Sequence, residues 1–224
     1  MKVQGSRFGI PLFAAFGLLL ITSCSSFGAG DGEERTARLP HRICGTDISS
    51  APIARMYPGP YTEASMHVPS EGRIDRISTS KGKTEGGCSI AIGQTKPDVY
   101  SDLTVNARTY PTRSMKNVLA GFEHQFTSND ATLSLGPARG HVAHEYAQLI
   151  QECKQSEGGS AGRPFAVISE LFFQDRSSYK ISEEDLNKGA AAQVANVARY
   201  LRSSVLKCSG PELPDGTPEI TKSD

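Results

Sequence analysis

Five cysteines have the most distinctive chemistry in this 224-residue chain: Cys24, Cys44, Cys88, Cys153 and Cys208. A thiol can form a disulfide, bind a metal, act as a nucleophile or carry a lipid. Since the number is odd, at least one of these thiols has a different role if the others pair. No C-x-x-C or H-x-x-x-H spacing is present, so the cysteines do not indicate a zinc site.

The first cysteine follows a segment typical of a signal peptide. Lys2 and Arg7 are the only charged residues before it, and residues 10–21 are almost wholly apolar. A membrane-spanning helix needs roughly 20 apolar residues, which is longer than this run. A positive region followed by a short apolar region instead predicts a cleaved signal peptide over residues 1–23.

The residues around the predicted cleavage point, Ile21-Thr22-Ser23-Cys24, resemble the lipobox of bacterial lipoproteins. That resemblance implies a diacylglyceryl group on the Cys24 sulfur and cleavage before this residue, since two acyl chains anchor a protein stably. We therefore expect attachment to the outer side of the cell membrane, with residues 24–40 as a flexible tether rich in Ser, Gly and charge. The alternative is an ordinary secreted protein in which Cys24 is fortuitous.

Outside the cytoplasm, the remaining even number of cysteines predicts disulfides. Four cysteines allow three pairings, and the sequence alone does not choose among them. We favour Cys44–Cys88 and Cys153–Cys208. Each of these would close a loop of about 50 residues and stabilise the fold by roughly 4 kcal/mol in the chain-entropy model.

Other residue patterns give little support for catalysis. In His141-x-x-His144-Glu145 the Glu follows both His, whereas zinc hydrolases place it between them. Two S-x-x-K patterns, Ser80–Lys83 and Ser177–Lys180, fall in predicted loops and not on a helix. No nucleophile elbow or phosphate-binding glycine pattern is present. We therefore predict no catalytic residues, no metal ligands and no cofactor.

Charge and length narrow the class of protein further. Lys and Arg together number 24, as do Asp and Glu, so the net charge is zero and falls to −2 once residues 1–23 are removed. This balance excludes a strongly basic nucleic-acid-binding domain. Residues 41–209 are long enough for one domain with a sizeable core. Residues 210–224, with three prolines, are predicted to be a disordered tail.

Hydrophobic periodicity predicts a mixture of strands and one long helix. Alternation of apolar and polar residues predicts a strand hairpin from residues 88–93 and 101–110, with Thr104, Asn106 and Arg108 on its polar face. Further strands are expected at 117–126, 130–136 and 165–173, and a mobile loop at 71–87. Residues 142–153 are ambiguous, because Val142, Tyr146, Leu149 and Cys153 fit a helix face, but we favour a strand at 147–153. Ser182 caps a helix whose apolar stripe continues to Val205 before Ser209, Gly210 and Pro211 end it.

Four features follow one another along the chain: the lipobox, "RICG" at 42–45, a second cysteine opening "CSIAIG" at 88–93, and a capped helix ending at Cys208. Their order resembles that of small actinobacterial cell-surface lipoproteins, including the domain-of-unknown-function 3558 family. The chain is also similar in this order to the extracellular sensor domains related to that family. The resemblance implies an antiparallel sheet packed against helices and no established catalysis.

We therefore expect an α+β lipoprotein that acts as a non-enzymatic ligand-binding, partner-binding or sensor-like module. Its partners would be the membrane, through Cys24, and an unknown envelope protein or small ligand. The alternative is a cell-envelope hydrolase whose active site is assembled in space. That alternative requires a Ser or His beside a carboxylate in a cleft.

Overall fold

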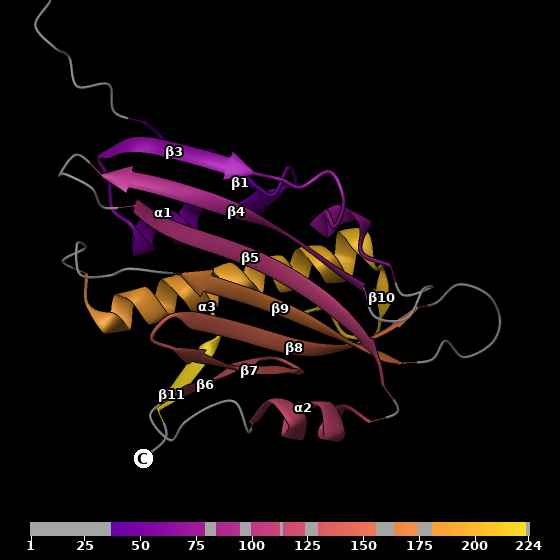
Figure 1. The fold of residues 1–224 in the computed structure, drawn as a ribbon. Coiled ribbons are helices and arrows are strands. Elements are labelled where there is room, and N and C mark those ends of the chain that lie inside the picture. The colour runs from indigo at the N-terminus through magenta and orange to yellow at the C-terminus, as the bar shows by residue number, and fades with distance from the viewer. Residues whose placement is uncertain are drawn as a thin grey trace, which may run out of the picture. The chain divides into compact units, whose positions relative to one another are not determined.

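The computed structural model describes residues 37–78, 84–94, 100–112, 114–123, 130–155, 164–173 and 181–222. The predicted signal peptide, Cys24 and most of the predicted tether lie outside these residues. The described residues form an α+β domain in which helices cover an antiparallel sheet (Figure 1). This is the predicted fold class, with the long C-terminal helix and the two favoured disulfides present.

The main sheet of the described chain has nine strands, and every neighbouring pair is antiparallel. Eight of them run in the order β11-β6-β7-β8-β9-β5-β4-β3, and β10 pairs with β8. Their bounds are β3 (Tyr61–His67), β4 (Thr84–Gln94), β5 (Tyr100–Pro111), β6 (Ala131–Leu135), β7 (Ala138–Ala143), β8 (Tyr146–Gln155), β9 (Phe165–Phe173), β10 (Cys208–Ser209) and β11 (Glu219–Lys222). The hairpin of β4 and β5 and the strands predicted at 130–136, 147–153 and 165–173 are confirmed.

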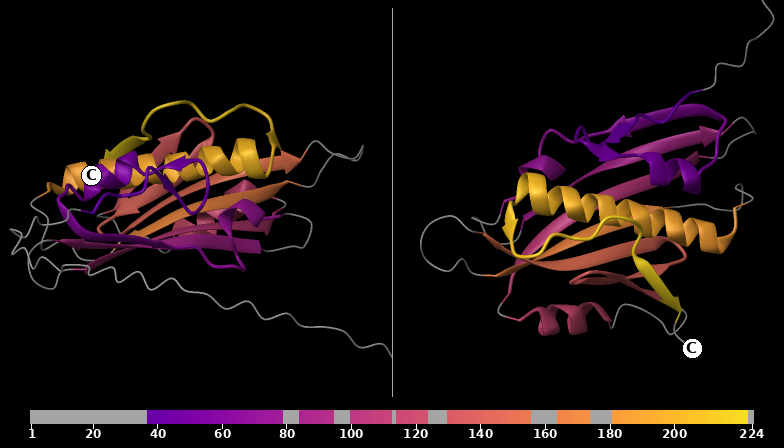
Figure 2. Two further views of the ribbon diagram at one scale, coloured as in Figure 1. Left: turned by 90° about the horizontal axis from the view of Figure 1, so that it is seen from above. Right: turned by 180° about the vertical axis from the view of Figure 1, so that it is seen from behind.

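One face of the sheet is covered by helix α3 (Glu183–Tyr200), which continues into a π-helical turn, η2 (Leu201–Val205) (Figure 2). The Ser182 side chain accepts a hydrogen bond from the Asp185 backbone N–H, at 3.1 Å, so the predicted cap is present. Leu186, Val194 and Leu201 are buried against the sheet in the predicted apolar stripe. Helix α3 and the sheet therefore enclose the main core.

Helix α2 (Met115–Glu123) lies where the sequence predicted a strand at 117–126, and that prediction was wrong for the described residues. Its apolar residues are Met115, Val118, Leu119 and Phe122, which recur with the period of a helix face. They pack on Ile150, Ala166 and Ile168, on the sheet face opposite α3. This second, smaller core covers only part of that face (Figure 1).

The predicted mobile loop at 71–87 is also corrected where the structure describes it. Residues 74–76 form the 3-10 turn η1 (Ile74–Arg76), in which Ile74 is fully buried, and β4 already begins at Thr84. The Gly87 backbone N–H donates to the Gly72 carbonyl at 2.8 Å. A Cβ on Gly86 would lie 2.6 Å from the Arg73 carbonyl oxygen, so glycine allows this close backbone contact. The glycines that indicated flexibility therefore make a packed contact.

The predicted disordered tail is ordered as far as residue 222. Leu213 is buried in the main core, and β11 pairs with β6 at the edge of the sheet. The Arg199 guanidinium donates to the backbone carbonyls of Pro214 and Gly216. Prolines cannot continue a helix, but they suit an extended segment fixed by such contacts. The composition of the tail was therefore a poor guide to its order.

Short elements complete the fold next to the N-terminal end of the described chain. They are β1 (Arg42–Ile43), β2 (Ile48–Ser49) and helix α1 (Ala51–Met56). The Cys44–Cys88 disulfide ties the turn after β1 to β4, with a Cα–Cα distance of 5.2 Å. The Cys153–Cys208 disulfide ties β8 to β10, with a Cα–Cα distance of 5.0 Å. Both bridges therefore attach peripheral segments to the sheet.

Gly189 in α3 and Gly121 in α2 should respond oppositely to replacement by alanine. A Cβ on Gly189 would lie 2.4 Å from Met56 Cγ and 3.2 Å from the Pro52 carbonyl oxygen of α1, whereas a Cβ on Gly121 meets nothing within 4 Å. We expect Gly121→Ala to raise the free energy of unfolding by about 0.5–1 kcal/mol. Gly189→Ala should lower it, because α1 must move. Denaturant unfolding of both variants tests this, and a gain in stability from Gly189→Ala would contradict the packing.

Candidate functional site

The sheet face opposite α3 carries rows of polar side chains that cross several strands. The alternation along β5 places Thr104, Asn106 and Arg108 on this face, as the sequence predicted, while Leu103 and Val105 are buried beneath. Because facing residues of antiparallel strands share a face, cross-strand register decides which side chains meet. Asn106 pairs with Glu170 of β9, and Glu170 pairs with Gln148 of β8.

Glu170 is the centre of a buried polar network. Its side chain is fully buried, and its Oε1 forms an ion pair with Arg108 Nη2. The same oxygen accepts hydrogen bonds from the Tyr146 hydroxyl at 2.8 Å and from Gln148 Nε2 at 3.2 Å. Gln148 Nε2 also donates to the Tyr146 hydroxyl at 2.7 Å. Side chains from three adjacent strands therefore converge on one carboxylate oxygen.

The charge of Glu170 affects its two neighbours in ways that keep the network together. Burial raises the pKa of the Tyr146 hydroxyl, and the negative charge and hydrogen bonding of Glu170 raise it further. Burial alone would lower the pKa of Arg108, but the hydrogen bond and charge of Glu170 outweigh it and raise the pKa. Tyr146 therefore remains a hydrogen-bond donor and Arg108 remains a cation at neutral pH.

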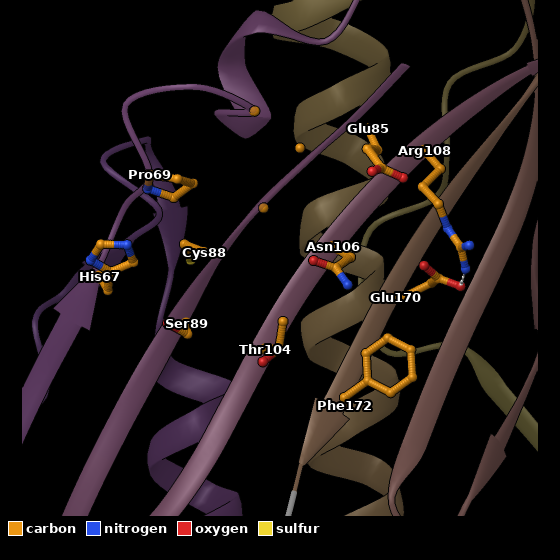
Figure 3. Close-up of a pocket in the computed structure, with 13 residues that line it drawn as sticks. His67, Pro69, Glu85, Cys88, Ser89, Thr104, Asn106, Arg108, Glu170 and Phe172 are labelled. Carbon is orange, nitrogen blue, oxygen red and sulfur yellow. Dashed lines mark hydrogen bonds and ion pairs between the residues drawn. The ribbon is translucent and has the colours of Figure 1, made fainter. Parts of the chain in front are cut away.

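The second oxygen of the carboxylate, Oε2, is buried and has no hydrogen-bond partner in the described part of the chain. Most buried polar atoms in native structures have a partner, and an unpartnered one generally needs an explanation. Figure 3 shows one Glu170 oxygen directed at Arg108 and the other turned towards the side of Asn106. The unused acceptor therefore faces a hollow in the sheet surface.

That hollow is a pocket of about 470 Å³ on the open face, which we call the open-face pocket. Its wall includes residues of β3, β4, β5 and β9 (Figure 3). Polar lining residues are His67, Glu85, Ser89, Thr104, Asn106, Arg108 and Glu170. Phe172 supplies the apolar wall and is 39% exposed, the one large hydrophobic side chain exposed to this degree among the described residues.

The Phe172 ring is held in place although it is exposed. Its centroid lies 4.7 Å from that of the Tyr146 ring, with the planes tilted by 46°. Because the Tyr146 hydroxyl is bound to Glu170, this contact connects the aromatic wall of the pocket to the buried carboxylate. The pocket thus combines a fixed aromatic surface, a buried acceptor and several hydroxyl and amide groups. Such a combination can bind and orient a small molecule.

The cysteines, histidines and S-x-x-K patterns considered from the sequence are not part of the Glu170 network of the described residues. Cys44 and Cys88 are joined, as are Cys153 and Cys208, and Cys88 lies in the pocket wall as half of its bridge. Cys24 and both S-x-x-K patterns lie outside the residues that the structure describes.

The histidines of the described chain do not form a metal motif. His141 is in β7 and His144 is in the following turn. Within the described ranges, no group of three or more His, Cys, Asp or Glu side chains could hold a metal ion. His67 faces Ser89 across β3 and β4, but no hydrogen bond joins these two described residues. Glu170 is on β9, two strands away from Ser89.

Sequence reasoning missed the residues at the centre of the site, although one signal was present. Glu170 interrupts the apolar run "FAVISELFF", which the sequence correctly predicted to be a strand. A carboxylate within a strand buried on both faces needs a partner, since Glu is almost never fully buried unless it is paired. That partner is Arg108, 62 residues earlier in the chain. The sequence thus indicated that Glu170 needs a partner, but it did not indicate that this partner is Arg108.

Together the fold and the site define an α+β domain with a polar and aromatic pocket on the open face of its sheet. No protein-family model matches this chain, and no curated protein or solved structure shows significant similarity to it. None of the helices among the described residues is long and apolar enough to cross a membrane.

Proposed function

We propose that this protein is a lipid-anchored extracytoplasmic module that binds a small ligand in the open-face pocket without chemically changing it. The observation that carries the binding function is the pocket itself, with the exposed ring of Phe172 beside the unpartnered oxygen of Glu170. A concave site that combines an aromatic wall with a few placed polar groups is typical of small-molecule binding sites. The two disulfides support an oxidising compartment.

The proposed anchor rests on the sequence around Cys24 and on the proposed relationship to actinobacterial cell-surface lipoproteins. Each buried methylene of an acyl chain contributes about 0.8 kcal/mol, so a diacylglyceryl group would hold the domain at the membrane. A pocket on a membrane-tethered domain would present its ligand, or a ligand-dependent surface, to other envelope components. This arrangement suits delivery or sensing.

One mass-spectrometry experiment tests both parts of the proposal. The full chain is purified from the membrane of its native cell and weighed intact, first under non-denaturing and then under denaturing conditions. We expect a denatured mass that shows loss of residues 1–23 and acylation of Cys24, and a non-denatured mass that carries an additional small molecule. Phe172→Ala should lose that additional mass, whereas Phe122→Ala, on α2, should keep it. An unacylated protein would contradict the anchor, and ligand retention in Phe172→Ala would contradict the site.

The hydrolase alternative is favoured by one feature only, the proximity of His67 and Ser89 across neighbouring strands in the pocket. A nucleophilic serine normally needs a hydrogen-bonded base that is oriented by a third group. Glu170 is already bound by Arg108, Tyr146 and Gln148, two strands from Ser89. Ester hydrolysis that is abolished by Ser89→Ala would nevertheless establish this alternative.

A further inference from the structure

The chemistry of the open-face pocket also indicates what kind of ligand it takes, and this step rests on the proposed function. The unpartnered Glu170 Oε2 is a fully buried acceptor on a side chain whose other oxygen is hydrogen-bonded and ion-paired. Leaving such an acceptor unpaired carries a large desolvation penalty. A ligand that donates an N–H or O–H to this atom would remove that penalty. The first requirement is therefore a hydrogen-bond donor.

The charges of the pocket favour a donor that is positive. Its lining carries the carboxylates of Glu85 and Glu170 and the guanidinium of Arg108, which sum to one negative charge when His67 is counted as neutral. One nitrogen of Arg108, Nη2, forms the ion pair with Glu170 Oε1, which partly neutralises both charges. Glu85 forms no ion pair with any described residue. An anionic ligand would be repelled by two carboxylates, whereas a cationic ligand would be attracted by the net negative charge of the pocket.

The aromatic wall of the pocket favours the same charge. Phe172 and Glu170 are two residues apart on β9, so their side chains project from the same face about 7 Å apart. The face of an aromatic ring attracts a cation, and its surface packs against hydrocarbon. A cationic head at Glu170 would place the attached carbon groups over Phe172. Thr104 and Asn106, on the neighbouring strand, lie opposite these residues and can bind further polar groups.

From these observations we propose that the open-face pocket binds an organic cation, an ammonium group on an aromatic or hydrocarbon body. The ammonium donates a hydrogen bond to Glu170 Oε2, and the body packs on Phe172. Arg108 is a positioning residue, because its ion pair with Oε1 fixes the carboxylate so that Oε2 faces the pocket. Glu85 contributes charge at the rim.

Three small probes of matched shape test this inference: phenethylammonium, neutral 2-phenylethanol and anionic 3-phenylpropionate. Each is titrated into the ¹⁵N-labelled full chain while the backbone amide signals of β5 and β9 are followed. We expect phenethylammonium to bind with a millimolar Kd, at least 10-fold tighter than either matched probe. Equal or tighter binding of the alcohol or the carboxylate in the pocket would overturn the cation inference while leaving a binding pocket. If no probe moves these signals, the inference also fails, and the proposed function is then judged by the native mass experiment.

Variants assign the interaction to its two predicted contacts. Glu170→Gln keeps the shape but removes the charge, and we expect it to weaken phenethylammonium binding at least 10-fold with little effect on the alcohol. Phe172→Ala should weaken binding of both probes, and since Phe172 is partly exposed this variant should fold normally. Glu183→Gln, at the exposed start of α3, is the matched control and should bind as the parent does. Unchanged binding in both pocket variants would overturn the inference.

Discussion

Loss of the Cys153–Cys208 disulfide is expected to lower the free energy of unfolding by about 4 kcal/mol, a large share of the 5–15 kcal/mol typical of a domain. The bridge spans 55 residues, and removing it frees that whole loop in the unfolded chain. In the folded protein, Cys153 is fully buried in β8 and fixes β10, which has only two residues. The replacement Cys153→Ala with Cys208→Ala therefore loses a covalent link and side-chain packing together.

Denaturant unfolding of this double variant and of Cys44→Ala with Cys88→Ala measures both effects. The second bridge spans 44 residues, so the chain-entropy model predicts a similar loss of about 4 kcal/mol. Reduction of both bridges in the parent protein should lower the free energy of unfolding by about as much as all four Cys→Ala substitutions together. The two values should differ only by the packing of the sulfur atoms, which the substitutions remove. A loss below about 1 kcal/mol for either pair would show that the unfolded state is already restricted, against the chain-entropy account.

Local patterns were sufficient to predict the elements in which one face is consistently buried. The alternation of Leu103, Thr104, Val105 and Asn106 predicted strand β5 and also its polar face. Helix α3 was readable because a capping serine, three acidic residues and an apolar stripe agree with one another. Where several local signals favour the same structure, sequence reasoning is reliable.

The errors arose where tertiary contacts decide the outcome. In residues 117–126, apolar residues are close enough in sequence to be taken for a strand, but Val118, Leu119 and Phe122 meet the sheet only as a helix face. The glycines and prolines of residues 71–87 and 210–222 indicated flexibility, yet Ile74 and Leu213 are buried there. A single apolar residue that is buried in the core can fix an otherwise polar segment to the domain. The average composition of the segment does not reveal such a residue.

The site could not be predicted for a related reason. Its central residues, Arg108, Tyr146, Gln148 and Glu170, belong to three strands and meet only through strand order and register. A shift of one residue in the β5–β9 pairing would place Glu170 on the opposite face of the sheet from Arg108. Sequence reasoning gave the polar face of β5 but neither its neighbour in the sheet nor the register.

Replacing Glu170 by alanine is expected to lower the free energy of unfolding by about 3 kcal/mol, because breaking a buried ion pair from one side leaves uncompensated groups. Arg108, Tyr146 and Gln148 all lose their shared acceptor in Glu170→Ala. The Arg108 side chain is 28% exposed, so water can solvate part of the freed guanidinium, which places the loss at the lower end of the usual range.

A double-mutant cycle distinguishes the ion pair from simple loss of packing. Arg108→Met alone and Glu170→Leu alone should each destabilise the protein, since the first leaves Glu170 buried without its cation and the second leaves Arg108 without its carboxylate. Glu170→Leu combined with Arg108→Met replaces both charges by apolar groups, and such replacements are often neutral or stabilising. We therefore expect the double variant to be more stable than either single variant, with a coupling of about 2 kcal/mol. Additive losses would show that the two side chains act independently. Because the double variant also lacks the acceptor, it should fold without binding phenethylammonium, which would separate the stability of the sheet from the chemistry of the pocket.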